Sequence, residues 1–479
     1  MMDYDKLLCM ERIRDYKKGF KNTDRRSEFE KDYHRIIGSA SFRRLQDKTQ
    51  VFALDSSDFI RTRLTHSLEV SSIAKSLGQT GGALLKEKGI VTDEQVGYMT
   101  DILLCAGLLH DIGNPPFGHF GEAVIRDWFR ENLDVITYKG KPLSGYLSDV
   151  QKADLCNFEG NAQSLRVVAK LHHLVDDNGM NLTKGLLNTI IKYPTSSVEI
   201  DKKAGDIRLK KMGYFEADSE LFQNITHSTG AGNSRHPLTF LLEAADDIAY
   251  STADIEDGYK KGILSFMKLW SILENNQYTG CEPALYADCE YAFDRLRTLY
   301  ERAKEHGEYD PESYAVLNWT VSMQSRLISV VCNSFVEHQD EILSGDYKVD
   351  LFEGTSSHYL IRLLKETSFT HVFQIQPIVR QELSAGTIIK TLLDSFVPAA
   401  LVFDTDEPKS AVQNKLIRLI SPNYVNHYRK QAKAACGEGP GAEDEGERLY
   451  LRMILVTDFI SGMTDSYAKA LYQELMGQL

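Results

Sequence analysis

The sequence has no long apolar run, and its first residues contain no apolar stretch of the signal-peptide type. The chain has 479 residues, and none of its apolar runs approaches the roughly 18 consecutive apolar residues that a membrane span requires. We therefore expect a cytoplasmic protein without a membrane partner.

Cysteine is also scarce, and no two cysteines have CxxC spacing. An odd number of cysteines without that spacing argues against both a zinc ribbon and a disulfide framework. We expect free thiols at all seven positions, which are Cys9, Cys105, Cys156, Cys281, Cys289, Cys332 and Cys436.

Basic residues are fewer than acidic ones. The chain has 55 Lys and Arg against 68 Asp and Glu, which gives a formal net charge of -13. Extensive wrapping of nucleic acid is therefore not expected, although a local basic patch can bind a phosphate ligand on an acidic protein.

Period-two alternation is scarce, whereas apolar residues recur at spacings of three and four, which favours an all-α fold. Two such series are Leu68, Ile73 and Leu77, and Leu238, Leu241, Leu242 and Ile248. No repeat, coiled-coil heptad or long polar linker interrupts the helical pattern.

Three segments depart from this pattern. Residues 193–216 contain helix breakers, so we expect a loop or short hairpin there. Residues 134–155 and 436–447 are expected to be surface excursions, the second of them mobile.

The dipeptide His110-Asp111 follows the run 102–109, which is hydrophobic on all sides and predicts a buried helix. Gly113 and the two prolines after it stop that helix. Burial of a carboxylate is costly unless something compensates its charge. An imidazole beside a carboxylate at a buried helix end is therefore typical of half a metal site.

Two other helices carry residues that could complete such a site. His66 enters an amphipathic helix after Arg61 and Arg63. Asp246, Tyr250 and Asp254 are spaced by four and so share one helix face. A lone histidine is more often a capping or surface group, and an acidic run is more often a solvated face. The apolar residues around Asp246 favour burial instead.

Together His66, His110, Asp111 and Asp246 form a mixed nitrogen and oxygen set. Such a set suits Mn²⁺, Fe²⁺ or Zn²⁺ and suits Ca²⁺ or Mg²⁺ less well. Residues 157–163, an amide-rich entry into a helix, fit either helix capping or a functional role.

The order His66, His110-Asp111 and Asp246 resembles the H…HD…D pattern of the HD-domain phosphohydrolases. The flanking sequence resembles, more narrowly, the deoxyguanosine triphosphate triphosphohydrolase family, and the likeness runs with gaps from about Asp32 to Tyr472. Six collinear motifs carry it, at residues 43–52, 61–66, 115–119, 158–163, 243–250 and 461–468.

The resemblance implies an all-α fold with an HD-domain helical core and at most a short hairpin. We expect residues 1–265 to form the catalytic core with an N-terminal helical segment. Residues 266–479 would form a C-terminal helical region packed on that core.

The resemblance also implies an activity: hydrolysis of dGTP, or of other dNTPs, at the α-phosphorus. The products would be a deoxynucleoside and tripolyphosphate, and the attacking water would be activated by the metal. By this resemblance His66, His110, Asp111 and Asp246 hold one divalent ion per active site. Mn²⁺ or Mg²⁺ is expected first, and Fe²⁺, Ni²⁺ or Zn²⁺ would also fit. His119 and Glu122 match the family's catalytic pair.

Substrate contacts follow from the same resemblance. Tyr250, Asp254 and Gln50 are expected to read the deoxyribose, with the Tyr250 ring leaving no room for a 2′-hydroxyl. Three further residues would meet the triphosphate, namely Arg63, Lys192 and Tyr193. By family analogy we expect a homo-oligomer, often a hexamer, and a nucleotide or single-stranded DNA as a candidate effector.

Two alternatives remain at this stage. The chain could be an HD-superfamily phosphohydrolase for another nucleotide, or a nucleotide-sensing regulator that keeps the fold without catalysis. The sugar-reading set Gln50, Tyr250 and Asp254 favours a linear deoxynucleotide over the first alternative. The complete ligand set and catalytic pair argue against the second.

Overall fold

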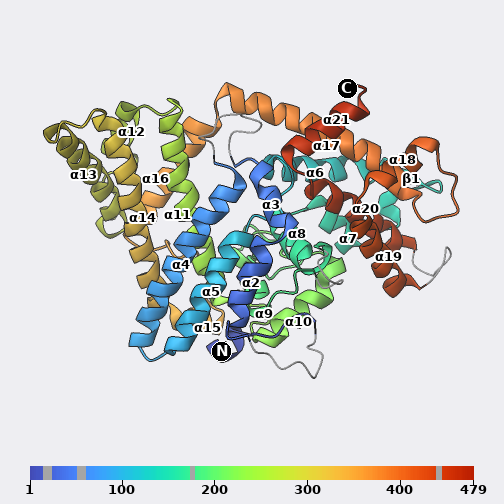
Figure 1. Cartoon of the computed structure of the whole chain (residues 1–479), viewed down its shortest axis with the longest axis horizontal. Coiled ribbons are helices and arrows are strands. Elements are labelled where there is room, and N and C mark those ends of the chain that lie inside the picture. The colour runs from blue at the N-terminus through green and yellow to red at the C-terminus, as the bar shows by residue number, and fades with distance from the viewer. Residues whose placement is uncertain (15–23, 51–60, 173–178, 438–444, 479) are drawn as a thin grey trace.

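The computed structural model describes residues 1–14, 24–50, 61–172, 179–437 and 445–478. Within those ranges the chain is helical, and its only strands are β1 (Thr137–Tyr138) and β2 (Lys141–Pro142), an antiparallel pair. The all-α prediction is therefore confirmed (Figure 1).

The helices of the N-terminal half begin with α1 (Tyr4–Leu7), α2 (Glu28–Ile37), α3 (Ala40–Arg43), α4 (Arg63–Glu87), α5 (Asp93–Leu109) and α6 (Gly118–Asn132). They continue with α7 (Asp149–Cys156), α8 (Gly160–Arg166), α9 (Lys184–Ile190), α10 (Ser219–Thr229) and α11 (Pro237–Lys260). The short segments between them are η1 (Arg44–Asp47), η2 (Leu143–Gly145), η3 (Val167–Leu171), η4 (Ile207–Leu209) and η5 (Glu216–Asp218).

The C-terminal half adds α12 (Phe266–Glu274), α13 (Pro283–Glu305), α14 (Pro311–Glu337), α15 (Gln339–Ser344) and α16 (His358–Ser368). It ends with η6 (Phe369–Phe373), α17 (Gln376–Leu401), α18 (Ala411–Leu419), α19 (Pro422–Cys436), α20 (Glu445–Ser461) and α21 (Asp465–Leu475).

Helices α4 and α5 pack closely along their length. Each begins with a capping box, in which Thr62 or Thr92 exchanges hydrogen bonds with the third residue of its helix. Near the end of α5 the approach requires Gly107, because a Cβ atom there would lie 2.5 Å from Cα of Ser71. This contact brings the end of α5 against the first turns of α4.

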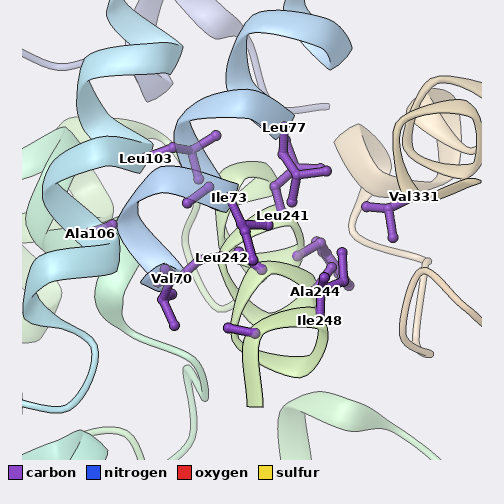
Figure 2. Packing of buried hydrophobic residues seen from close by; sticks show 14 of the residues in the cluster. Val70, Ile73, Leu77, Leu103, Ala106, Leu241, Leu242, Ala244, Ile248 and Val331 are labelled. Atoms are coloured by element: carbon purple, nitrogen blue, oxygen red, sulfur yellow. The ribbon is translucent and has the colours of Figure 1, made fainter. Parts of the chain in front are cut away.

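A large apolar core joins these two helices to α11 and α14 (Figure 2). Val70 and Ile73 of α4 and Leu241 and Ile248 of α11 belong to this core, and all four are buried. Burying an aliphatic side chain of this size contributes roughly 1.5–3 kcal/mol. The core therefore fixes α4, α5 and α11 relative to one another.

A second apolar cluster joins α6 and α7 to α17, α19, α20 and α21. Helix α17 crosses the top of Figure 1 from the α16 side toward α18. Each of the two clusters draws residues from both sides of position 265. The domain boundary at that position stays a prediction.

Two local predictions are confirmed in part. Residues 193–216, predicted as a loop or short hairpin, form a loop that contains η4 and reaches the start of η5, whereas the hairpin lies within 134–155, where none was predicted. The sequence cues for a turn were present in both segments, but only the second pairs its flanking residues. Leu68 lies on α4 as predicted but is 49% exposed, because its position faces away from the core.

Two other predictions reach residues outside the described ranges. The mobility expected of 436–447 concerns mainly residues 438–444, and the motif at 43–52 extends over residues 51 and 52. All seven cysteines are free thiols, as predicted. Of the helices described, none combines the length and apolarity that crossing a membrane requires.

Candidate active site

The first turns of α4, the end of α5 and the middle of α11 meet at a cluster of histidines and carboxylates. Donor atoms of His66, His110 and Asp111 all lie within 4.8 Å of one another. Asp246 of α11 adjoins them, with its Oδ1 atom 3.2 Å from Nε2 of His66. The structure thus brings together the four residues predicted as metal ligands.

The imidazole of His110 is held with one nitrogen aimed into this cluster. His110 caps the C-terminus of α5, and its Nδ1 atom lies 2.8 Å from the carbonyl oxygen of Gly107. Nδ1 is therefore the protonated nitrogen, and Nε2 has a lone pair. Nε2 is buried and makes no hydrogen bond within the described structure. Such a nitrogen is costly unless a ligand uses it.

The two aspartates are each held by a cation. Asp111 forms an ion pair with Arg63 and accepts a hydrogen bond of 2.6 Å from the side-chain amide of Asn114. Asp246 pairs with Lys192 at 2.9 Å. These contacts leave Oδ1 of Asp246 facing both histidines.

The charges in this cluster shift the pKa values in opposite directions. Burial is the largest influence on His110 and lowers its pKa, against the opposing charges of Asp111 and Asp246. Burial is also the largest single influence on His66 and opposes its charge, but the hydrogen bond that His66 donates to Asp246 and the charges of Asp246 and Asp111 together raise its pKa. Burial would raise the pKa of Asp246, yet Lys192 and the two histidines hold it well below its usual range. The carboxylates are therefore ionised at neutral pH.

His119 and Glu122 form a second pair in the first two turns of α6. Nδ1 of His119 lies 3.1 Å from Oε2 of Glu122. Glu122 is buried, and its Oε1 accepts the backbone N–H of Gly160 at 2.9 Å. The hydrogen bond and charge of Glu122 raise the pKa of His119. Because Nδ1 faces Glu122, Nε2 is the nitrogen left for a ligand.

Both groups open into one cavity of about 540 Å³, a size typical of small-molecule sites. Its polar lining is Thr49, Gln50, Arg63, His66, Asp111, His119, Asp246, Tyr250, Asp254, Gln374, Gln381 and Glu382. The rest is Phe117, Gly118, Phe120, Phe369, Phe373, Ile378 and Ala385.

The three predicted sugar-reading residues share this cavity. Oε1 of Gln50 is buried and makes no hydrogen bond within the described structure. Asp254 is 4% exposed, and burial raises its pKa to about 7. The ammonium of Lys365 lies 5.5 Å from the centre of the Tyr250 ring and forms an ion pair with Asp247. Lys365 thus supports the ring.

Of the three residues predicted to contact the triphosphate, one lines the cavity and two do not. Arg63 lines the cavity, and its guanidinium packs so tightly on Gly118 that a Cβ there would lie 2.2 Å from Nη2. Lys192 and Tyr193 are not part of the lining. Lys192 instead reaches the cluster through Asp246, and Tyr193 is buried.

The amide-rich segment 157–163 supplies the C-cap of α7 and the N-cap of α8, but none of its side-chain amides makes a capping hydrogen bond. Asn157 lies at the end of α7, and Gln163 donates a hydrogen bond of 2.9 Å to Asp458. Its link to the site is Gly160, which donates to Glu122.

One wall of the cavity was missed by the sequence analysis. It consists of side chains from η6 and α17, between Phe369 and Ala385. Ile378, Gln381 and Ala385 have helical spacing, which indicates one face of a helix. That spacing identifies a shared face but not the cavity that the face lines.

Comparisons with known proteins agree with this geometry. The HD domain profile matches residues 63–179. A deoxyguanosinetriphosphate triphosphohydrolase-like protein of Listeria monocytogenes is 47% identical, over 99% of this chain and 100% of its own length. A like-named protein of Synechocystis is 35% identical over 94% of both chains. A deoxyguanosinetriphosphate triphosphohydrolase of Klebsiella pneumoniae is 32% identical over 94% of this chain and 93% of its own. The chain therefore belongs to the deoxyguanosinetriphosphate triphosphohydrolase family of HD-domain hydrolases.

Proposed function

We propose that this protein hydrolyses deoxynucleoside triphosphates at the α-phosphorus, with dGTP as the preferred substrate. The products are a deoxynucleoside and tripolyphosphate. One observation carries the proposal: the His66, His110, Asp111 and Asp246 cluster and the His119–Glu122 pair line, or directly adjoin, a single nucleotide-sized cavity.

The cluster fits a divalent metal ion. The buried Nε2 of His110 has no hydrogen-bond partner among the described residues and lies 3.5 Å from Asp246 and 3.6 Å from Asp111. Two imidazole nitrogens and two carboxylates suit Mn²⁺ and related ions. Such an ion, when bound, supplies Lewis-acid stabilisation of phosphate charge and lowers the pKa of water.

The protein's own residues supply the proton that the leaving group needs. Cleavage between the α-phosphorus and O5′ makes O5′ an alkoxide unless it is protonated. Glu122 raises the pKa of His119, which favours the imidazolium form whose Nε2–H can be donated to O5′. Glu122 is buried and bonded to Gly160, so it keeps the imidazole in one orientation. Arg63 adds positive charge beside the phosphates.

Tyr250 and Asp254 of α11, together with Gln50, account for the proposed selection of deoxyribose over ribose. Asp254 and Gln50 offer hydrogen-bond partners to a 3′-hydroxyl, and Oε1 of Gln50 has no other partner within the described structure. The Tyr250 ring, supported by Lys365, packs where a 2′-hydroxyl would otherwise fit. A ribonucleotide would therefore clash with the ring.

Preference for guanine is supported by the α17 wall. Gln381 has a buried Oε1 without a hydrogen bond in the described structure, and Glu382 adds a carboxylate acceptor. Guanine presents N–H donors at N1 and N2, whereas the adenine N1 is an acceptor. Phe369 and Phe373 give the same wall flat apolar surfaces on which a base can stack.

The test is a substrate panel on the purified full chain with Mn²⁺ or Mg²⁺. The panel compares the four dNTPs with GTP, cyclic GMP and a guanosine tetraphosphate, and products are separated by anion exchange. We expect tripolyphosphate and deoxyguanosine from dGTP, with GTP much slower. Turnover of only the cyclic or tetraphosphate substrate would support another HD-superfamily activity. Binding of dGTP without turnover would indicate a nucleotide-sensing regulator.

A further inference from the structure

The C-terminal segment 461–466 contacts the candidate active site from outside the cavity, although none of the described residues after Ala385 lines it. Asp465, the first residue of α21, is 1% exposed. Both of its carboxylate oxygens accept hydrogen bonds from segments far away in the sequence. One oxygen holds the loop before α6, and the other holds the segment before residue 50.

The first contact fixes a backbone conformation that is unfavourable by itself. Oδ1 of Asp465 accepts the N–H of Phe117 at 2.9 Å. Phe117 has φ 62° and ψ 18°, a left-handed conformation that costs a non-glycine residue about 1–2 kcal/mol. Gly118 follows with φ 60°. His119 comes next, so the direction in which α6 starts sets the position of its imidazole.

The second contact fixes the segment that carries Gln50. Oδ2 of Asp465 accepts the N–H of Thr49 at 2.9 Å and its hydroxyl at 2.6 Å. Thr49 also forms an isolated β-bridge with Thr62, the N-cap of α4. One carboxylate therefore sets the position of Gln50 relative to His119, across the cavity.

Lys48 reinforces the same connection with a buried ammonium. Its Nζ atom donates to the carbonyl of Asn114 at 2.5 Å and to the carbonyl of Ser461 at 2.8 Å. Residues 48 and 49, the loop 114–117 and the segment 461–465 thus form one bonded unit. Thr49 and Phe117 line the cavity. Segment 461–465 contributes no lining residue and only holds those two segments in place.

We infer that Asp465 is a positioning residue, which holds His119 and Gln50 at the separation that the reaction requires. The inference rests on the proposed function, because only that function gives His119 and Gln50 their roles. Losing the carboxylate leaves the N–H of Phe117 without its partner and releases the left-handed turn. A displacement of about 1 Å in a catalytic group can cost roughly 10²-fold in rate.

The test is a double-mutant cycle between Asp465→Ala and His119→Ala, with dGTP turnover to tripolyphosphate as the readout. We expect Asp465→Ala to lower kcat by roughly 10²-fold in the wild-type background and by less than about 3-fold when His119 is already absent, because the part that acts through the substrate-binding Gln50 raises KM rather than lowering kcat. Ser466→Ala is the matched control, since the Ser466 hydroxyl bonds only to Asp47 among the contacts described. Its kcat should stay unchanged.

Asp465→Asn covers the case in which the alanine variant does not fold. It keeps the side-chain shape and one acceptor oxygen, so it can satisfy Phe117 or Thr49 but not both. We expect a loss of kcat of at least about 10-fold, again confined to proteins that contain His119. An equal loss of kcat with and without His119, or no loss in either, would overturn the inference. The proposed function would still stand if the wild type turned over dGTP. Absence of wild-type turnover would overturn both.

Discussion

Nε2 of His110 lies 3.5 Å from Oδ1 of Asp246 and yet forms no hydrogen bond in the described structure. The two residues come from α5 and α11, which one apolar core holds together. Because Nδ1 of His110 faces the carbonyl of Gly107, the lone pair of Nε2 is directed toward the carboxylates. Two electron-rich atoms in this position need a cation between them, which is the physical basis of the proposed metal site.

Asp246→Asn should abolish turnover and weaken Mn²⁺ binding. The substitution keeps the shape of the side chain but removes a ligand charge, and it leaves Lys192 without its anion. The loss in affinity should exceed the roughly 10–100-fold typical of losing an outer-sphere partner. Calorimetric titration with Mn²⁺ measures it. Asp247→Asn is the control, because Asp247 pairs with Lys365 and should leave Mn²⁺ affinity unchanged.

Tyr250→Ala should relax selection against ribonucleotides. Tyr250 lines the cavity, and under the proposed sugar selection removing its ring opens space for a 2′-hydroxyl. Apolar pockets discriminate such additions by about 10–200-fold, so the dGTP to GTP ratio of kcat/KM should fall by a factor in that range. Tyr250→Phe keeps the ring and should keep the ratio. An unchanged ratio in the alanine variant would remove Tyr250 from sugar selection.

Glu382→Gln should reduce the preference for dGTP over dATP. A carboxylate that accepts from guanine N–H groups is worth about 1.5–3 kcal/mol, or roughly 10- to 100-fold in kcat/KM. Competition assays with both nucleotides measure the ratio. Leu383→Ala is the matched control, because Leu383 is the next residue of α17 and is 67% exposed. If both variants behave alike, α17 does not read the base.

Glu122→Gln should move the basic limb of the pH profile to lower pH. Glu122 raises the pKa of His119, so the imidazolium persists to higher pH and activity is lost as pH rises through that pKa. Without the carboxylate charge the pKa of His119 falls, and the loss begins earlier. The measurement is kcat/KM against pH for both proteins. A limb that stays in place would exclude His119 as the proton donor.

Asp154→Asn should stabilise the protein at neutral pH. Burial raises the pKa of Asp154 to about 6, so the folded state resists its ionisation. As pH rises from the ordinary carboxyl pKa through 6, the free energy of unfolding of the wild type falls by about 3 kcal/mol. The amide variant does not ionise and keeps this stability. Its amide oxygen can still accept from Tyr450 and from the N–H of Glu216. Urea unfolding at acidic and neutral pH measures the difference, with the exposed Asp149→Asn as control.

The helices around the cluster of His66, His110, Asp111 and Asp246 could be predicted because local patterns determine them. The apolar run before His110 is a buried helix that ends at residue 109, and 246, 250 and 254 share one face of α11. The close approach of α4 and α5 depends on Gly107, which the sequence alone does not distinguish from other glycines. Packing therefore had to come from the structure.

The α17 wall and the role of Asp465 could not be predicted for a different reason. Their partners lie hundreds of residues away, as in the hydrogen bond between Asp465 and Phe117. No spacing rule connects such positions. The sequence allowed a loop or a short hairpin at 193–216 and did not predict the pairing at 137–142, because turn residues signal a reversal of the chain but not whether its flanks pair.

The position of bond cleavage tests the central claim most directly. The full chain is incubated with dGTP and Mn²⁺ in ¹⁸O-labelled water, and the products are analysed by ³¹P NMR and mass spectrometry. Attack at the α-phosphorus predicts unlabelled deoxyguanosine and tripolyphosphate with one ¹⁸O on a terminal phosphate. Formation of dGMP with pyrophosphate, or of dGDP with orthophosphate, would contradict the account.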